Sequence, residues 1–435
     1  MMRIVKRQRL VTTVESNKKM NHHHELPEEI MHDILSRLPA ESLYQCCRFV
    51  SKDWFNLIKD PDFINLHLSR INNKHASSNG LIALCHKKNQ FFNLLDENNH
   101  PTPTPTTSIS FKALKIHLDL PLLSQSQTIK IVGSANGLMC LSILPQDDLF
   151  YICNPVTGEI LQLPIAPGIA PYCENYNLEL VYPSSSGFGF HAATNTYKIV
   201  RTWFFRVKGS VGLIKTGIEI YNVASGVWRW IDQLVISKIM CHMNVSLLFL
   251  NEALHWQINY TYDQSYIGVI GIGDETFTTF ENPIVDYEIE SRGLCSLRQC
   301  LCLIHKRYDK HIVVWIMKQY GMVQSWTKER VISRQMFGSI KTLSFYPLNT
   351  MKNEIVIVDS SGDYQGYYDI EKQEVKEILI HGTHSSRWDS QIVPHVGSLI
   401  SPRSIACTND IHQVSSAKSR KPIRFRLKKN VKKPP

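Results

Sequence analysis

The sequence predicts a mainly β protein that carries a small helical module near its N-terminus. Between residues 26 and 68, apolar residues recur at helical spacing. From Gly80 onward, short runs rich in Val, Ile, Tyr, Phe and Trp alternate with Gly, Pro, Asn and Asp turns, which is typical of strands. Hairpin-like units then recur along the chain. Together these observations predict a β-propeller-like body of about six blades.

The first predicted helix begins at Pro27, whose missing N–H is tolerated at a first helical position. Glu28 and Glu29 follow in the first turn, where carboxylates favour the positive end of the helix dipole. Pro39 ends the helix. The apolar residues of this segment are Ile30, Ile34, Leu35 and Leu38.

A second helical pattern runs from about Ser42 and ends at Asp60-Pro61. Its apolar face is expected to carry Leu43, Val50, Trp54 and Ile58. About forty residues are too few to form a large core of their own. The apolar surface must therefore pack either on the β body or on another protein, and the spacing alone leaves both open.

The segments LPEEI, ILSRLP, ESL, VSKDW and LIKDPDF, in that order, resemble the F-box. This resemblance implies docking on a Skp-type adaptor, which in turn is bound to a cullin–RING ubiquitin ligase. One departure is the run from Ser42 to Val50, with its Cys46-Cys47 pair, which is one residue longer than the usual pattern. The resemblance implies adaptor contacts at Leu26, Pro27, Ile30, Ile34, Leu35, Leu38, Pro39, Leu43, Val50, Trp54 and Ile58.

The β body shows a weak repeat of paired hairpins. Tyr221, Ile270, Trp315 and Tyr368 mark the same point in successive units, at separations of 49, 45 and 53 residues. A looser unit begins at Gly80 and brings the expected number of blades to about six. We expect the strand around Ser398 to return beside the first blade, because ring closure removes exposed sheet edges.

The segments GLMCL, NPVTGEILQLP, GFGF with ATNTYKIVR, IEIYNVASGVWR, LNEALHW and SLISP resemble the F-box-associated domain of plant F-box proteins. They are spread over most of residues 133–402. The resemblance implies that this body holds the protein to be ubiquitinated, at residues that the sequence does not identify. Because the chain has no Gly-Gly pair and no recurring Trp-Asp, we assign it to neither the kelch nor the WD40 class.

Charge is concentrated at the two ends of the chain. The net charge is +10, of which residues 1–19 carry +5 and residues 418–433 carry +9, so the remainder carries −4. Basic tails on an acidic body argue against a nucleic-acid partner. The C-terminal tail fits either a nuclear-import signal or a solvated solubility tail. The expected segments are a basic disordered arm (1–21), the F-box (22–70), a linker (71–79), the propeller-like domain (80–408) and a basic disordered tail (409–435).

No motif of a known active site is present. The chain lacks GxSxG, the P-loop, GxGxxG and HExxH, and Gly271-Ile272-Gly273-Asp274 is predicted to be a hairpin turn. His255 and His305 lie in apolar strands, as core histidines do. Asp286, Glu288 and Glu290 alternate, which predicts a shared strand face. We therefore expect no catalytic residue, no metal and no cofactor.

Composition places the protein away from membranes. No apolar run approaches the roughly 20 residues of a membrane span. The scattered cysteines, without CxxC spacing, predict reduced thiols in a cytoplasmic and/or nuclear protein. The functional hypothesis is a non-catalytic substrate-recognition subunit of a Skp–cullin–F-box (SCF) ubiquitin ligase, which presents an unidentified target protein. The alternative is a glycan-binding or glycan-processing propeller protein.

Overall fold

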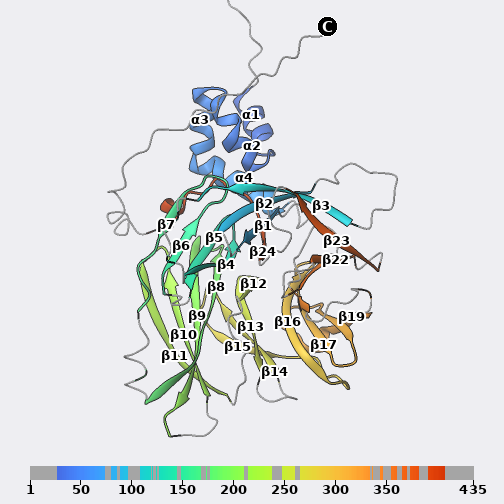
Figure 1. Cartoon of the computed structure of the whole chain (residues 1–435). Coiled ribbons are helices and arrows are strands. Elements are labelled where there is room, and N and C mark those ends of the chain that lie inside the picture. Colours follow the sequence, from blue (N-terminus) through green and yellow to red (C-terminus); the bar gives the residue numbers. More distant parts are fainter. Residues whose placement is uncertain are drawn as a thin grey trace, which may run out of the picture.

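The computed structural model consists of a helical module seated on one side of a large β body (Figure 1). Leu26, the expected arm 1–21 and the expected tail 409–435 lie outside the described residues. The described residues are 27–73, 80–85, 89–96, 108–118, 120, 124, 127–144, 148–167, 173, 177–209, 214–237, 247–259, 265–333, 336, 343–345, 354–359, 365–369, 373–381 and 390–406.

The helical module contains four short α-helices. The expected second helix is interrupted, because Ser51 adopts an extended backbone and its side chain caps a new helix by accepting from Trp54 N at 3.1 Å. Asp60 caps the following helix in the same way, with Oδ1 3.0 Å from Phe63 N. No helix among the described residues is both long and apolar enough to cross a membrane. The elements are α1 (Glu28–Leu35), α2 (Ala40–Gln45), the 3-10 helix η1 (Cys47–Phe49), α3 (Lys52–Lys59) and α4 (Pro61–Asn73).

Four of the sheets have four antiparallel strands each, in chain order. The first contains β4 (Thr128–Ala135), β5 (Leu138–Leu144), β6 (Phe150–Cys153) and β7 (Ile160–Gln162). The second contains β8 (Leu178–His191), β9 (Thr196–Val207), β10 (Ile214–Asn222) and β11 (Val227–Ser237). The third contains β12 (Leu248–Leu250), β13 (Ala253–Asn259), β14 (Ser265–Gly271) and β15 (Phe277–Glu281). The fourth contains β16 (Ile289–Leu297), β17 (Cys300–Arg307), β18 (His311–Met317) and β19 (Trp326–Ser333).

The fifth sheet has eight strands, so the described strands form five sheets rather than the expected six or so. The count differs because β23 pairs in parallel with β3, which joins the last repeat unit to the first. Sequence repeats mark units of chain, whereas edge pairing decides how many sheets those units make. The order of this sheet is β20 (Leu343–Phe345), β21 (Glu354–Asp359), β22 (Gln365–Asp369), β23 (Glu374–His381), β3 (Ser108–Ile116), β2 (Gln90–Asp96), β1 (Gly80–Cys85) and β24 (Ser390–His395).

The structure confirms that the marker residues of the predicted repeat occupy equivalent positions. The four marker residues lie in β10, β14, β18 and β22, each the third strand of a unit. Two of the turns that follow such third strands are also as predicted. Asn154 and Asn222 each accept backbone N–H groups two and three residues ahead, and a glycine with positive φ completes each turn.

The C-terminal part of the chain returns beside β1 as expected, but the returning strand ends before Ser398. The returning strand is β24, which pairs with β1, and Ser398 lies beyond its end. Gln391 links β24 to the next sheet, accepting from Ile131 N at 2.8 Å and donating to Ile131 O at 2.7 Å. Ser398 instead donates to Gly137 O at 2.9 Å, on the turn between β4 and β5.

The GFGF segment of β8 is explained by packing between sheets. Phe188 is buried against the first sheet. The glycines on either side face the third sheet, where there is no room for side chains. A Cβ on Gly187 would lie 2.6 Å from Leu247, and one on Gly189 would lie 2.7 Å from Ile272. Alternation along the strand therefore gives one neighbouring sheet a large side chain and the other bare backbone.

Candidate functional site

The helical module presents apolar side chains to solvent. Ile30 and Ile34, one helical turn apart on α1, are 46% and 45% exposed. Val50, after η1, is 64% exposed. Pro27 and Pro39 are exposed as well. These five members of the expected contact set are free to meet a partner in the described structure.

Other members of the expected set form the interior of the module. Leu35, Leu43 and Ile58 are buried, together with Phe63, and Leu38 and Trp54 are partly buried against them. A partner reaches these buried side chains only by opening the core. Their apolar character is explained by folding, whereas about half of the Ile30 and Ile34 surfaces remains in solvent.

Sequence reasoning missed two exposed aromatic residues. Phe49 is 69% exposed and Phe55 is 37% exposed. A cation lies over each ring: the Arg48 Cζ is 4.6 Å from the Phe49 centroid, and Lys59 Nζ is 4.2 Å from that of Phe55. The available signal for the first of these was Ser51, because an N-cap there begins a new helix and places Phe49 in the connection before it rather than on a continuous apolar face.

An ion-pair network orients α1 against α4. Asp33 lies 2.9 Å from Arg37 Nε and 2.7 Å from Arg70 Nη1. Hydrogen bonds from Arg37 and then from Arg70 lower the pKa of the Asp33 carboxyl. Arg70 also donates to Ser36 Oγ at 2.6 Å. The two helices are thereby cross-linked at the end of α1 that carries the exposed Ile34.

The module is packed onto the propeller rather than tethered by the linker alone. Leu399, from the segment after β24, is buried in the core of the module. Leu68 of α4 is buried in the core between the first two sheets, together with Ile400. Asn154 Nδ2 holds the intervening segment by donating to the carbonyl oxygens of Ser398 at 2.9 Å and Ile400 at 2.8 Å. The exposed helical face therefore has a defined orientation relative to the propeller.

A pocket of about 380 Å³ lies on the propeller itself. It is lined by the turns after β8, β12 and β14, by strand β15, and by the connection between β18 and β19. It therefore draws on three sheets. The side chains that give it its chemistry are His191, Glu252, Asp274, Thr276, Phe280 and Tyr320.

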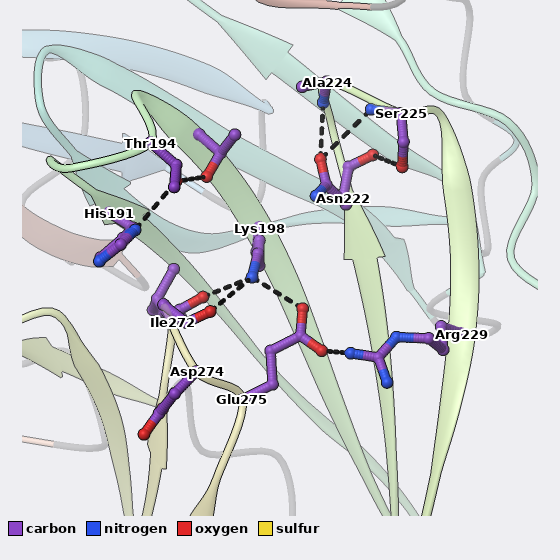
Figure 2. Close-up of polar contacts among 12 residues, drawn as sticks. His191, Thr194, Lys198, Asn222, Ala224, Ser225, Arg229, Ile272, Asp274 and Glu275 are labelled. Carbon is purple, nitrogen blue, oxygen red and sulfur yellow. Dashed lines mark hydrogen bonds and ion pairs between the residues drawn. The ribbon is translucent and has the colours of Figure 1, made fainter.

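Figure 2 shows Lys198 beside the turn that carries Asp274, one of the residues that line the pocket. Lys198 Nζ donates to the carbonyl oxygens of Ile272 at 2.5 Å and Gly273 at 3.4 Å, and lies 2.7 Å from Glu275 Oε1. Burial, and then the nearby charge of Arg229, lower the pKa of Lys198. Arg229 also pairs with Glu275 (Figure 2). The turn between β14 and β15 is thus tied to the second sheet, and the predicted hairpin turn at residues 271–274 is confirmed.

The two strand histidines are buried, as predicted. His255 Nε2 lies 2.7 Å from Tyr320 Oη, and burial lowers the pKa of His255 to about 4. His305 Nδ1 lies 2.9 Å from Tyr287 Oη, and burial, with a smaller contribution from Arg292, lowers the pKa of His305 to about 3. Both imidazoles are neutral at physiological pH and are unsuited to bind a proton there.

The carboxylates that alternate in the sequence do not share a strand face. Asp286 and Glu288 precede β16, and only Glu290 belongs to that strand. Glu290 pairs with Lys306 at 2.8 Å. The prediction is wrong because the strand begins only at Ile289. Within the part of the chain that is described, no three His, Cys, Asp or Glu side chains are grouped so as to hold a metal ion.

Comparison with known proteins covers both parts of the molecule. Residues 97–402 match the family described as "F-box associated beta propeller domain", and residues 24–66 match the F-box domain. The chain is 24% identical to F-box protein CPR1 of Arabidopsis thaliana over 419 residues, covering 90% of this chain and 92% of that protein. It is 25% identical to F-box protein At3g07870 of the same plant over 418 residues, covering 86% and 91%. It is 24% identical to F-box/kelch-repeat protein At3g23880, also from Arabidopsis thaliana, over 324 residues, covering 72% and 81%.

Proposed function

This chain belongs to the F-box-associated β-propeller family and carries an F-box at its N-terminal end, and from that premise we propose that it is a substrate-recognition subunit of an SCF ubiquitin ligase. In this role the helical module binds a Skp-type adaptor, and the propeller binds a protein target. The subunit carries out no bond chemistry itself. By holding a target lysine near the charged ubiquitin-conjugating enzyme, it makes the transfer effectively intramolecular.

The observation that carries this proposal is the exposed apolar face of the helical module. Ile30 and Ile34 are about half exposed although the module has a complete core beneath them. Exposed apolar side chains grouped on one helix are typical of a protein-binding surface. Because Leu399 and Leu68 join the module to the propeller, a target bound on the propeller is held at a defined distance from the adaptor.

The proposal is tested by co-purification with a plant Skp-type adaptor. Changing Leu26 and Pro27 to Ala is expected to abolish binding. Leu26 lies outside the described residues, so its place in the contact set rests on the resemblance alone. The matched control is Ile284→Ala, since Ile284 is 98% exposed on the propeller. Full retention of the adaptor by the Leu26/Pro27 variant would count against the assignment.

The second candidate function is glycan binding or processing. The pocket on the propeller supports it to this extent: Glu252 and Asp274 lie near the aromatic rings of Phe280 and Tyr320. Paired carboxylates and aromatic rings are common to sugar sites. Tight binding of one glycan class on an array, with no adaptor binding, would favour this candidate over the first.

We further propose a cytoplasmic and/or nuclear location. The basic segment 418–433, with a charge of +9, has the composition of a nuclear-import signal, and equally that of a solubility tail. Imaging the full chain beside a chain ending at residue 408 distinguishes these roles, because only an import signal changes the nuclear fraction when it is removed.

A further inference from the structure

We propose that the pocket among the second, third and fourth sheets binds a basic side chain, lysine or arginine, on a segment of the target protein. This inference rests on the proposed receptor function and names the chemistry of its target site. The pocket is large enough for an extended basic side chain, at about 380 Å³. Its walls supply negative charge on one side and aromatic rings on the other.

The negative charge comes from two neighbouring turns. Glu252, on the turn after β12, is 47% exposed, and its Oε1 accepts from Ala192 N at 2.8 Å. Asp274, on the turn after β14, accepts from Thr276 N at 3.2 Å and Thr276 Oγ1 at 2.7 Å. These hydrogen bonds lower the pKa of Asp274 and keep it ionised. The described lining residues include no lysine or arginine, and the basic group beside the two carboxylates is His191, whose Nε2 lies 3.7 Å from Glu252 Oε2.

Two cations beside the pocket turn, Lys198 and Arg229, are paired with Glu275. In Figure 2 both cations lie on the Glu275 side of the turn, and the Asp274 side chain points away from them. With Glu252 and Asp274 included, these five groups carry a net charge of −1. The region therefore keeps negative charge facing the pocket and attracts a cation rather than an anion.

The aromatic wall is rigid because of a buried histidine. Leu248 O can only accept, so His255 Nδ1, 3.2 Å away, carries the ring proton. Nε2 is then an acceptor and receives the Tyr320 hydroxyl at 2.7 Å. The hydroxyl is thereby turned inward, while 39% of Tyr320 remains exposed. Its ring meets Phe280 edge to face, with centroids 5.4 Å apart at 84°.

This geometry suits a cation better than a sugar. Two rings at nearly a right angle offer no single flat platform for a pyranose, whereas a cation can bind the face of either ring. The carboxylates then complete the charge pairing. The pocket lies on the turns that join the first to the second strand and the third to the fourth strand of a sheet. The corresponding turns of the first sheet, between β4 and β5 and between β6 and β7, lie beside the helical module. A target held there lies on the same side of the ring as the adaptor.

The test uses the full chain in complex with a Skp-type adaptor. The probe is a short fluorescein-labelled arginine-rich peptide, measured by anisotropy at low salt beside a glutamine counterpart. The variant E252Q/D274N is expected to bind the probe about tenfold more weakly, as the loss of two partly exposed ion pairs implies. Its matched control is D286N/E288Q, which removes two exposed carboxylates that do not line the pocket and should bind as the wild type does.

The aromatic wall is tested separately. Tyr320→Ala is expected to weaken binding of the probe about fivefold, as the loss of one cation–π contact implies. Tyr320→Phe keeps the ring and should retain binding, which distinguishes the ring from its hydrogen bond to His255.

The proposal is overturned if E252Q/D274N binds the peptide as the wild type does, if D286N/E288Q loses as much binding, or if one glycan class binds tightly in place of the peptide. The chain's own segment 418–433 has the same basic chemistry. If the probe bound only after residues 407–435 were removed, the pocket would belong to that segment, and the assignment to a target would fall. If the wild-type chain and a chain ending at residue 406 both bind the adaptor but not the probe, the pocket alone is refuted. A chain that binds the probe but not the adaptor refutes the proposed function alone.

Discussion

Truncating the two half-exposed isoleucines of α1 should weaken adaptor binding while leaving the helical module folded. Ile30 and Ile34 leave 46% and 45% of their surface in solvent. Full burial of an isoleucine side chain contributes about 2 kcal/mol, so burial of the exposed half in a complex contributes about 1 kcal/mol each. The double variant I30A/I34A should therefore lose about 2 kcal/mol of binding free energy, or about 30-fold in Kd.

The assay is calorimetric titration with the adaptor, with urea unfolding of each variant beside it. The comparison variant is Leu35→Ala, one residue along the same helix but 1% exposed. It should lower the free energy of unfolding by about 2–5 kcal/mol, because it opens a cavity in the core of the module. Binding of I30A/I34A within twofold of the wild type would refute the reasoning, and so would a loss of stability as large as that of Leu35→Ala.

The remaining predictions concern the junction, the sheet packing and the buried histidines. Leu399→Ala should destabilise α1–α4 by about 2–5 kcal/mol, since Leu399 is buried in their core; hydrogen exchange in those helices should quicken, and should stay unchanged in Ile284→Ala. Gly189→Ala should cost about 1–3 kcal/mol by forcing its Cβ against Ile272; in urea unfolding, the double variant with Ile272→Ala should lose less than the sum of the two single losses, and strict additivity would contradict the contact. Burial lowers the pKa of His255 to about 4, that of His305 to about 3 and that of His395 to about 4. Their stabilisation is present above the unfolded value of about 6.5 and is lost as pH falls toward these values, by about 4 kcal/mol per pH unit for the three together. Urea unfolding between about pH 7 and about pH 5 measures this slope, and a flat profile would contradict it.

Much of the fold was predictable because local sequence and fold agree. Pro27 and Pro39 mark the ends of the first helical segment, and α1 lies between them. The turns that begin at Asn154 and Asn222 were readable because an Asn side chain and a positive-φ glycine make them locally. Such signals depend only on residues that are near neighbours in the chain, so they can be read directly from the sequence.

The candidate adaptor face was only partly predictable. Periodicity places Ile34 and Leu35 in one apolar segment, and nothing local separates them. In the folded chain Ile34 faces solvent, whereas Leu35 is buried in one core cluster with Leu399, which follows the last strand of the propeller in sequence. Which apolar residue is exposed and which is core is thus decided by packing across more than three hundred residues of chain.

The sequence by itself determined that a helical module precedes a β body and at what spacing the four-stranded unit recurs, because those features follow from periodicity, caps and turns. Only the tertiary structure decided that the outer edges of the first and last units join into one sheet, that Asn154 secures the segment beneath the module, and that Glu252, Asp274 and Tyr320 surround one pocket. These residues come from turns far apart in sequence. Ring closure brings these residues together, and no local sequence pattern shows that residues so far apart in the chain are neighbours in space.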